Sequence, residues 1–311
     1  LRENKIKEKD RIAAYTVNQI ETVESFIATS AIGAIWSSCS PDFGTQGVIE
    51  RFSQIKPKLL IITDRYYYNG KEINVLEKTS YDVLKRPGPE VAREADGTPH
   101  VCWGMHLFDE RFKILTQHPK LLRPVEQLLE SKVFVHQSRI NIKQRNGSVV
   151  EWHQDFGTYH RVDGIPEARG IMIGIFLDDV TPCNAPVLAI PGSHKDGLVS
   201  EAIIDENVVD HKGAAKFRFD ITDDTLSHLV DRQGIKSIEG PAGTVLLMNM
   251  AVVHGSSVNI SPLRRLLLYI NVSAVDNRGE SFARPEYYAA RDFNPLVELE
   301  PDCLLNYYST Q

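Results

Sequence analysis

The pattern of apolar and polar positions changes style along the chain, and its first part has the alternation typical of an α/β fold. Residues 23–35 are apolar and rich in alanine, which predicts a mostly buried helix, and residues 47–55 predict a second helix. Residues 59–63 form a short apolar run of strand type, and the Asn69-Gly70 turn follows it. Helices that feed short buried strands indicate a small α/β segment.

A break follows this segment. Residues 87–89 (Pro-Gly-Pro) and 94–99 are rich in turn formers and poor in apolar residues, as a linker or a surface loop would be. We therefore place a boundary near residue 80, which gives an N-terminal segment, 1–80, and a second domain, 81–311.

The second domain consists mainly of short strand-type runs. Residues 119–129 predict one amphipathic helix, and Thr222 predicts the start of another that ends before Gly234. The strand-type runs lie at residues 133–135, 140–142, 171–177, 187–190, 244–248 and 266–272. This pattern predicts a mainly β fold, with a double-stranded β-helix (jelly-roll or cupin-like) core and flanking helices.

Composition narrows the class of protein. The 311 residues are 42% hydrophobic and 24% charged, as in an ordinary globular protein, and the net charge is −6 without a basic stripe, so a nucleic-acid partner is not expected. No apolar run approaches the length of a membrane span, and the polar N-terminus does not have the form of a signal peptide. The four cysteines lie far apart without a CxxC motif, which predicts buried free thiols and a reducing, cytoplasmic location.

A metal-binding pattern begins at Trp152-His153-Gln154-Asp155. Alternate residues of a strand point to the same face, so His153 and Asp155 can bind one ion from a single strand. His254 ends the apolar run that follows Gly243 and is the natural third ligand. Two imidazoles and one carboxylate on one face suit a ferrous ion and leave the opposite positions open for a co-substrate and O2.

A lone His-x-Asp motif is weak evidence, but an arginine pair strengthens it. Arg264 and Arg265 open the apolar strand at 266–272, eleven residues after His254. An arginine that enters the barrel there can form a bidentate pair with the far carboxylate of 2-oxoglutarate. Because side chains alternate along a strand, only one of the two arginines points inward, and we expect the other in solvent.

Several motifs together resemble the phytanoyl-CoA dioxygenase (PhyH) family of Fe(II)- and 2-oxoglutarate-dependent oxygenases. These are His153-Gln-Asp155, the segment 185–194 (APVLAIPGSH), the turn 240–243 (GPAG), and His254-Gly-Ser256 followed by Pro262 and Arg265. The segments 135–141 (VHQSRIN) and 284–292 (RPEYYAARD) are similar to the branch that hydroxylates free amino acids and related zwitterions, to which proline trans-4-hydroxylase and ectoine hydroxylase belong.

The resemblance implies roles for individual residues. His153, Asp155 and His254 would bind iron, and Arg265 would bind the distal carboxylate of 2-oxoglutarate, which favours it over Arg264. The remaining implied positions are Asn141, Gln137 and Ser256 in the co-substrate or substrate pocket, Tyr159 as an aromatic wall, and Arg284 as a clamp for the substrate carboxylate. Gln137 and Asn141 could instead satisfy barrel backbone, Arg284 could be a surface lid residue, and His106, His136, His160 and His194 are interpreted as ordinary polar or structural residues.

The first 75 or so residues resemble a different family. The stretches 10–15, 33–44 and 68–72 are similar to acetoacetyl-CoA synthetase, an adenylate-forming enzyme, but the phosphate loop and catalytic lysine of that family are absent. We interpret the segment as a non-catalytic remnant that supplies packing or a subunit contact in a homo-oligomer. The pairing of both parts also resembles a fungal alkaloid-cluster oxygenase that closes an aziridine ring on L-valine.

The expected function is therefore oxidation of an unactivated C–H bond of a small free amino acid in secondary metabolism, by hydroxylation or ring closure, with 2-oxoglutarate converted to succinate and CO2. The resemblance also implies that Asp155 argues against halogenation, since halogenating relatives have a small residue there. Two alternatives remain open: a family member that acts on an acyl-CoA or a polycyclic natural product, and a non-catalytic binding or scaffold protein.

Overall fold

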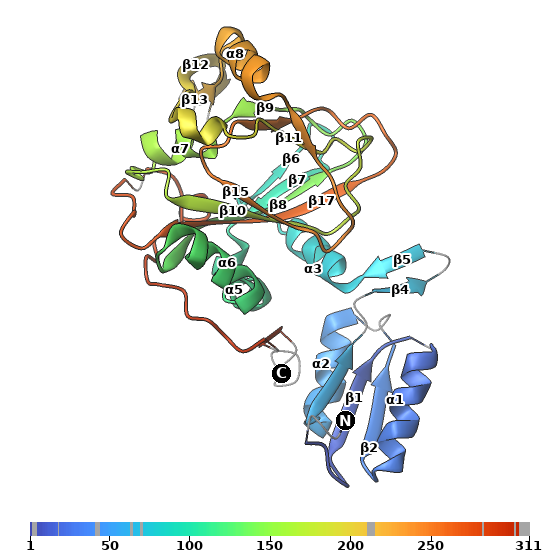
Figure 1. Cartoon of the computed structure of the whole chain (residues 1–311). Helices are drawn as coiled ribbons and strands as arrows, with labels where there is room; N and C mark the ends of the chain where they lie inside the picture. The colour runs from blue at the N-terminus through green and yellow to red at the C-terminus, as the bar shows by residue number, and fades with distance from the viewer. Residues whose placement is uncertain are drawn as a thin grey trace. The chain divides into compact units, whose positions relative to one another are not determined.

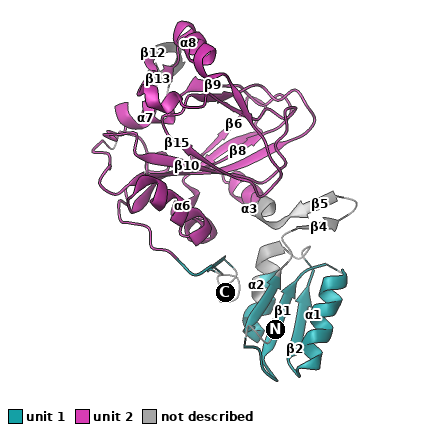
Figure 2. Cartoon of the chain, viewed as in Figure 1, with its two compact units in different colours: residues 1–79, 299–311 teal, residues 80–298 magenta. Residues whose placement is uncertain are grey.

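The chain divides into two compact units, and each is described by itself. The computed structural model describes residues 1, 5–17, 19–40, 44–62, 65–68, 71–209, 215–281, 283–301 and 303–304. Unit 1 comprises residues 1–79 and 299–311, and unit 2 comprises residues 80–298 (Figure 2). The chain passes from unit 1 to unit 2 between residues 79 and 80, and residues 299–311 are grouped with unit 1.

Unit 1 is built on a short parallel sheet. Strands β1 (Arg11–Tyr15), β2 (Ile35–Cys39) and β3 (Leu59–Ile62) pair in the order β2-β1-β3, and β4 (Arg65–Tyr68) pairs with β5 (Lys71–Asn74). Helices α1 (Ile20–Ala31) and α2 (Gly44–Ile55) connect the three parallel strands, so the unit has α/β architecture (Figure 1). The predicted turn at Asn69-Gly70 lies outside the described residues.

Helix α1 is more exposed than its apolar sequence predicts. Ile20 and Phe26 are 74% and 47% exposed, whereas Thr29 is fully buried. The core of this unit forms between the sheet and α2, where Ala13 and Phe52 belong to one buried cluster. The prediction of a mostly buried helix over 23–35 was wrong, because apolar content predicts a helix but not which of its faces packs on a sheet.

Unit 2 contains two facing sheets and the helices around them (Figure 1). The major sheet has the order β15-β10-β17-β8-β7-β6, and the minor sheet has the order β14-β11-β16-β9. The strands of the major sheet are β6 (Val91–Arg93), β7 (Pro99–Trp103), β8 (Val133–Lys143), β10 (Gly170–Phe176), β15 (Val245–Asn249) and β17 (Arg265–Ala274). Those of the minor sheet are β9 (Val150–His153), β11 (Val187–Ala189), β14 (Lys236–Ile238) and β16 (His254–Ser256), and β12 (Glu201–Val209) pairs with β13 (Ala215–Asp220) separately.

Helices cover the outer face of the major sheet. Val125 of α6 (Pro119–Leu129) packs in one cluster with Ile270 and Val272 of β17. Phe112 of α5 (Glu110–Thr116) and Met105 of α4 (Met105–Phe108) belong to a second cluster, together with residues of α3 (Val75–Leu84). The inner face packs on the minor sheet through a third cluster that includes Met172, Leu267 and Val187. The two inner faces therefore enclose the interior in which a site can form.

The expected jelly-roll fold is confirmed, and several predicted elements match. Helix α6 has the predicted bounds, and Thr222 caps α8 (Asp223–Gln233) by accepting a hydrogen bond from the Thr225 amide, with Gly234 at the other end. The runs 133–135 and 140–142 belong to one continuous strand, β8, and the polar residues 136–139 between them were not predicted as strand.

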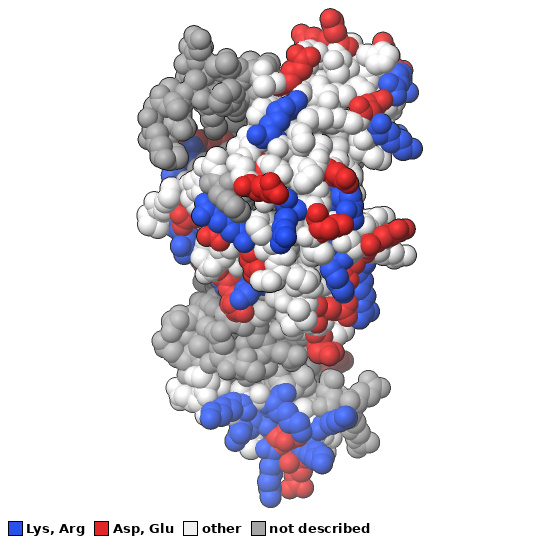
Figure 3. Space-filling view, turned by 90° about the vertical axis from the view of Figure 1, so that its left-hand side faces the viewer, with Lys and Arg blue, Asp and Glu red and all other residues white. Residues whose placement is uncertain are grey.

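The exposure of the cysteines, the character of the helices and the surface charges also bear on the predictions. Three cysteines are buried as predicted, but Cys183 is exposed. In the part of the chain that the structure describes, no helix has the length and apolar character needed to cross a membrane. On the face drawn in Figure 3, acidic and basic side chains are interspersed.

Candidate metal centre

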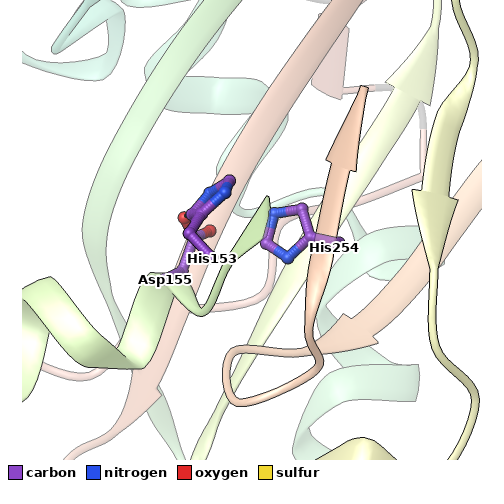
Figure 4. Close-up of side chains that lie close together, drawn as sticks. All are labelled: His153, Asp155 and His254. Atoms are coloured by element: carbon purple, nitrogen blue, oxygen red, sulfur yellow. The ribbon is translucent and has the colours of Figure 1, made fainter. Parts of the chain in front are cut away.

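Three side chains converge between the two sheets. His153 ends β9, His254 begins β16, and the two residues are directly paired across these antiparallel strands. Asp155 is the first residue of α7 (Asp155–Arg161). One potential ligand atom from each residue lies within 4.8 Å of the other two (Figure 4). The sequence-predicted triad is therefore assembled in the fold.

Asp155 does not lie on the strand that was expected to carry it. Gln154 is still extended (φ −116°, ψ 127°) and serves as the N-cap of α7, so the chain enters the helix immediately after it. The Gln154 amide donates to Gly197 O and Ala251 O, both within 2.8 Å, and this buried side chain fixes the corner. Because Gln154 is extended, the side chains of His153, at the end of β9, and Asp155, at the start of α7, still point to the same place.

Both histidines are oriented as metal ligands. His153 Nδ1 lies 2.8 Å from Glu151 O, and His254 Nδ1 lies 2.9 Å from Val252 O. A carbonyl oxygen only accepts, so each Nδ1 carries the proton and each Nε2 keeps a free lone pair. Burial, followed by the charge of His153, lowers the pKa of His254 to about 4. The His254 ring is therefore neutral near pH 7, which is the form that binds a metal.

The two oxygens of Asp155 have different surroundings. Oδ2 faces Arg139 Nη2 at 3.3 Å and Asn271 Nδ2 at 3.4 Å, whereas Oδ1 lies 3.4 Å from His153 Nε2. Burial works to raise the pKa of Asp155, but the charge of Arg139, followed by the neighbouring His153, outweighs burial and holds the pKa well below its usual range. Asp155 is thus a carboxylate with one oxygen held by the protein and the other directed to the histidines.

The interior faces of β8 and β17 carry a row of polar side chains. Register pairs Gln137 with Asn271, Arg139 with Tyr269, Asn141 with Leu267 and Lys143 with Arg265, and side-chain alternation puts these residues on one face. Four of their buried atoms have no hydrogen-bond partner within the described residues: Arg139 Nε, Asn141 Oδ1, Arg265 Nε and Asn271 Oδ1. Such atoms are costly to leave unpaired, so this face suits small polar ligands beside the metal.

One end of this row is cationic. Arg265 is 2% exposed and donates to Ala185 O, and it has no carboxylate partner among the described residues. Lys143 is 1% exposed and donates to Ser256 Oγ at 2.7 Å. Burial and then the Arg265 charge lower the pKa of Lys143 to about 7. Two buried cations that form no ion pair within the described residues are suited to bind an anion.

Arg264 differs from its neighbour as the alternation predicts. Its guanidinium pairs with Asp178 through Nε at 2.8 Å and through Nη2, and it contacts Tyr81. Only Arg265 therefore enters the interior. The expectation that Arg264 would sit in solvent was wrong, since its side chain is partly buried in this ion pair.

The other end of the row contains an aromatic and amide network. Tyr159 is buried, donates to Gln137 Oε1 at 3.3 Å and accepts from Asn271 Nδ2. Gln137 Nε2 donates to Tyr288 O at 2.6 Å. Burial raises the pKa of Tyr159, so its hydroxyl stays protonated. These contacts bring two of the sequence-predicted pocket residues, Gln137 and Tyr159, to one place.

Arg284 lies beside this network in a buried ion pair. It donates from Nε to Asp163 Oδ1 at 2.8 Å and from Nη2 to Oδ2, and its guanidinium is 5.9 Å from the Tyr159 ring. His136, interpreted from sequence as an ordinary polar residue, contacts the same Asp163 carboxylate at 3.0 Å. Arg284 Nη1 makes no hydrogen bond within the described residues. Asp163 and His136 were not identified from the sequence.

Comparison with known proteins gives one family and a consistent set of relatives. The model of the family "Phytanoyl-CoA dioxygenase (PhyH)" matches residues 81–266. L-proline trans-4-hydroxylase of Streptomyces griseoviridis is 34% identical over 239 residues, which is 75% of this chain and 89% of that protein. Ectoine dioxygenase of Streptomyces anulatus is 35% identical over 202 residues, which is 62% of this chain and 67% of that protein.

Solved structures agree with these relatives. EctD from S. alaskensis in its apo form has a TM-score of 0.62 at 28% identity, with 73% of this chain and 78% of that chain covered. EctD with 2-oxoglutarate and 5-hydroxyectoine has a TM-score of 0.62 at 27% identity, with 72% and 77% covered. A third EctD structure contains bound Fe. The arrangement of donors found here is thus compatible with an iron ion and a keto-acid co-substrate.

Proposed function

Because this chain belongs to the phytanoyl-CoA dioxygenase family and is a non-haem iron, 2-oxoglutarate-dependent oxygenase, we propose that it oxidises an unactivated C–H bond of a small free amino acid. Family membership sets aside the alternative of a non-catalytic scaffold. Relatives that act on L-proline and on ectoine support a small polar substrate for this chain. The observation that carries the proposal is the row of buried polar groups on both sides of the triad.

The donor set fits a ferrous ion. His153, His254 and Asp155 would hold it through Nε2, Nε2 and Oδ1, and the coordination positions opposite them would remain open. With 2-oxoglutarate and O2, the ion supplies the oxidising power for C–H cleavage. Arg139 and Asn271 keep Asp155 Oδ2 occupied, which favours binding of the metal through a single carboxylate oxygen.

The two ends of the polar row would take the two organic molecules. We assign the distal carboxylate of 2-oxoglutarate to Arg265, with Lys143, Ser256 and Asn141 beside it, because this end has two buried cations that form no ion pair within the described residues. We assign the amino acid to the end with Gln137, Tyr159 and Arg284, where Arg284 Nη1 can bind its carboxylate. The metal then lies between the two molecules, as the reaction requires.

The test is an assay of succinate formation over a panel of free amino acids, including L-proline and L-valine. We expect a subset of the panel to stimulate succinate formation well above the rate with 2-oxoglutarate alone. Stimulation by none of them would instead favour an acyl-CoA or a polycyclic natural product as the substrate.

The same assay addresses the finer proposal of ring closure on L-valine in secondary metabolism. Hydroxylation adds one oxygen atom to the product, whereas closure of an aziridine ring removes two hydrogens from L-valine. Mass spectrometry of the product distinguishes these outcomes, and a product of L-valine that carries the added oxygen would rule out ring closure for that substrate.

Lys143 leads to a prediction about pH. Its pKa of about 7 means that the ammonium group is charged below pH 7 and loses its proton above it. The attraction for dianionic 2-oxoglutarate therefore weakens as pH rises, and we expect the affinity of the iron-loaded protein to fall roughly tenfold between about pH 6 and about pH 9.

Anaerobic calorimetric titration with 2-oxoglutarate measures this effect. Lys143→Met should bind more weakly and should lack the pH-dependent step, while the exposed Lys120→Met serves as the control. An unchanged pH profile in Lys143→Met would show that another group causes the dependence.

A further inference from the structure

Asn271 is a buried amide whose orientation the surrounding chemistry determines. It lies on β17 opposite Gln137 and is 2% exposed. Its Nδ2 lies 3.4 Å from Asp155 Oδ2 and also contacts the Tyr159 hydroxyl. Because an ionised carboxylate can only accept hydrogen bonds, the NH2 group of Asn271 must face Asp155. The carbonyl oxygen Oδ1 must therefore point the other way.

Asn271 Oδ1 then has no donor within the described residues, although it is buried. Tyr159 OH and Arg139 Nη1 both donate to Gln137 Oε1, the latter at 3.0 Å. Arg139 Nε is also buried without a partner within the described residues, so it makes no hydrogen bond to Asn271 Oδ1. A buried carbonyl oxygen without a donor is unfavourable. Asn141 Oδ1 is also unpartnered, but no hydrogen bond fixes which way the Asn141 amide faces.

We propose that Asn271 Oδ1 accepts an N–H hydrogen bond from the amino group of the substrate and makes the enzyme selective for amino acids over their deamino analogues. This inference rests on the proposed function and adds the residue that recognises the ammonium group. A cationic N–H donor suits a lone buried acceptor, because hydrogen bonds to charged groups are the stronger ones.

The position of Asn271 also fits the geometry of a zwitterion. The hydroxyl of Tyr159 contacts the Asn271 amide, and the Arg284 guanidinium lies over the ring of the same tyrosine. The Tyr159 side chain therefore lies between Asn271 and Arg284. Arg284 can bind the carboxylate of the amino acid while Asn271 binds its amine. Since Asn271 also touches the metal ligand Asp155, an amine held there keeps the carbon atoms of the same molecule beside the metal.

The experiment compares amine-containing and amine-free ligands of the same shape. The pairs are L-proline with cyclopentanecarboxylate and L-valine with 3-methylbutanoate, titrated anaerobically into the full chain loaded with Fe(II) and 2-oxoglutarate. In the wild type we expect the better-bound amino acid to be preferred over its analogue by roughly 10- to 100-fold. In Asn271→Ala we expect this preference to fall below about threefold, with the amino acid losing affinity and the analogue changing little.

Two further variants keep the test sharp. Lys120→Met, at an exposed residue of α6, leaves the polar row intact, so its preference for the amine should persist. Asn271→Ser, which replaces the amide with a shorter hydroxyl, should lose the preference as Asn271→Ala does and serves if the alanine variant does not fold. The iron affinity of each variant is measured separately, because loss of the contact between Asn271 Nδ2 and Asp155 can weaken metal binding.

The outcomes separate this inference from the proposed function. If no free amino acid of the panel stimulates succinate formation by the wild type, the proposed function fails and the inference fails with it. If the wild type prefers the amino acid and Asn271→Ala retains that preference, the inference alone is wrong.

Discussion

The His153→Ala variant should lose stoichiometric iron binding and more than ~10³-fold of its amino-acid-stimulated succinate formation. The change removes one of the three ligands that we assign among the described residues, and even residues that only support a ligand commonly contribute 10- to 100-fold to metal affinity or activity. His153 is partly exposed at the edge of the interior, so we expect the fold to tolerate the change.

Anaerobic titration with Fe(II) and an assay of succinate formation measure both effects. His194→Ala is the matched control, because His194 is an exposed histidine of unit 2 in the short helical turn Ser193–Asp196. His194→Ala should bind iron and turn over as the wild type does. Wild-type iron affinity in His153→Ala would contradict the assignment of the metal centre.

Arg265→Gln should raise the KM for 2-oxoglutarate by roughly 10²-fold or more. Arg265 is buried without an acidic partner, and its loss would leave the distal carboxylate of the co-substrate without its main cation. Truncating one partner of a buried charge pair costs about 2–5 kcal/mol, and each 1.4 kcal/mol is tenfold in affinity. The KM for the amino acid should change far less, since the amino acid binds at the other end of the polar row.

The adjacent residue provides the control for this prediction. Arg264→Gln removes the same guanidinium group one position earlier, where it pairs with Asp178 on the outside of the barrel. We expect Arg264→Gln to lower thermal stability slightly and to leave the KM for 2-oxoglutarate unchanged. Equal effects of the two substitutions on that KM would refute the assignment of Arg265.

The sequence was sufficient for the features that depend on local pattern. Alternation predicted that only one of two adjacent arginines enters the barrel, and the cap at Thr222 and the helix at 119–129 follow from local signals. The triad could also be predicted from the sequence, because His153 and Asp155 are close in sequence and His254 precedes a recognisable turn and strand.

Features that depend on pairing between distant segments could not be predicted from the sequence. Lys143, Arg139 and Asn271 become parts of the site only through the register of β8 with β17, which a single sequence does not specify. Asp163 contacts both His136 and Arg284, and more than one hundred residues of chain separate it from Arg284. No local sequence pattern predicts such a contact. The exposed face of α1 was missed for the same reason, since its packing depends on the sheet of unit 1.

The most direct measurement of the metal centre is a crystal structure of the full chain with Fe(II) and 2-oxoglutarate, grown without oxygen. We predict one iron ion bonded to His153 Nε2, His254 Nε2 and a single oxygen of Asp155, with the distal carboxylate of 2-oxoglutarate on Arg265. An ion bound elsewhere, or a triad whose side chains point apart around an empty interior, would contradict the central claim.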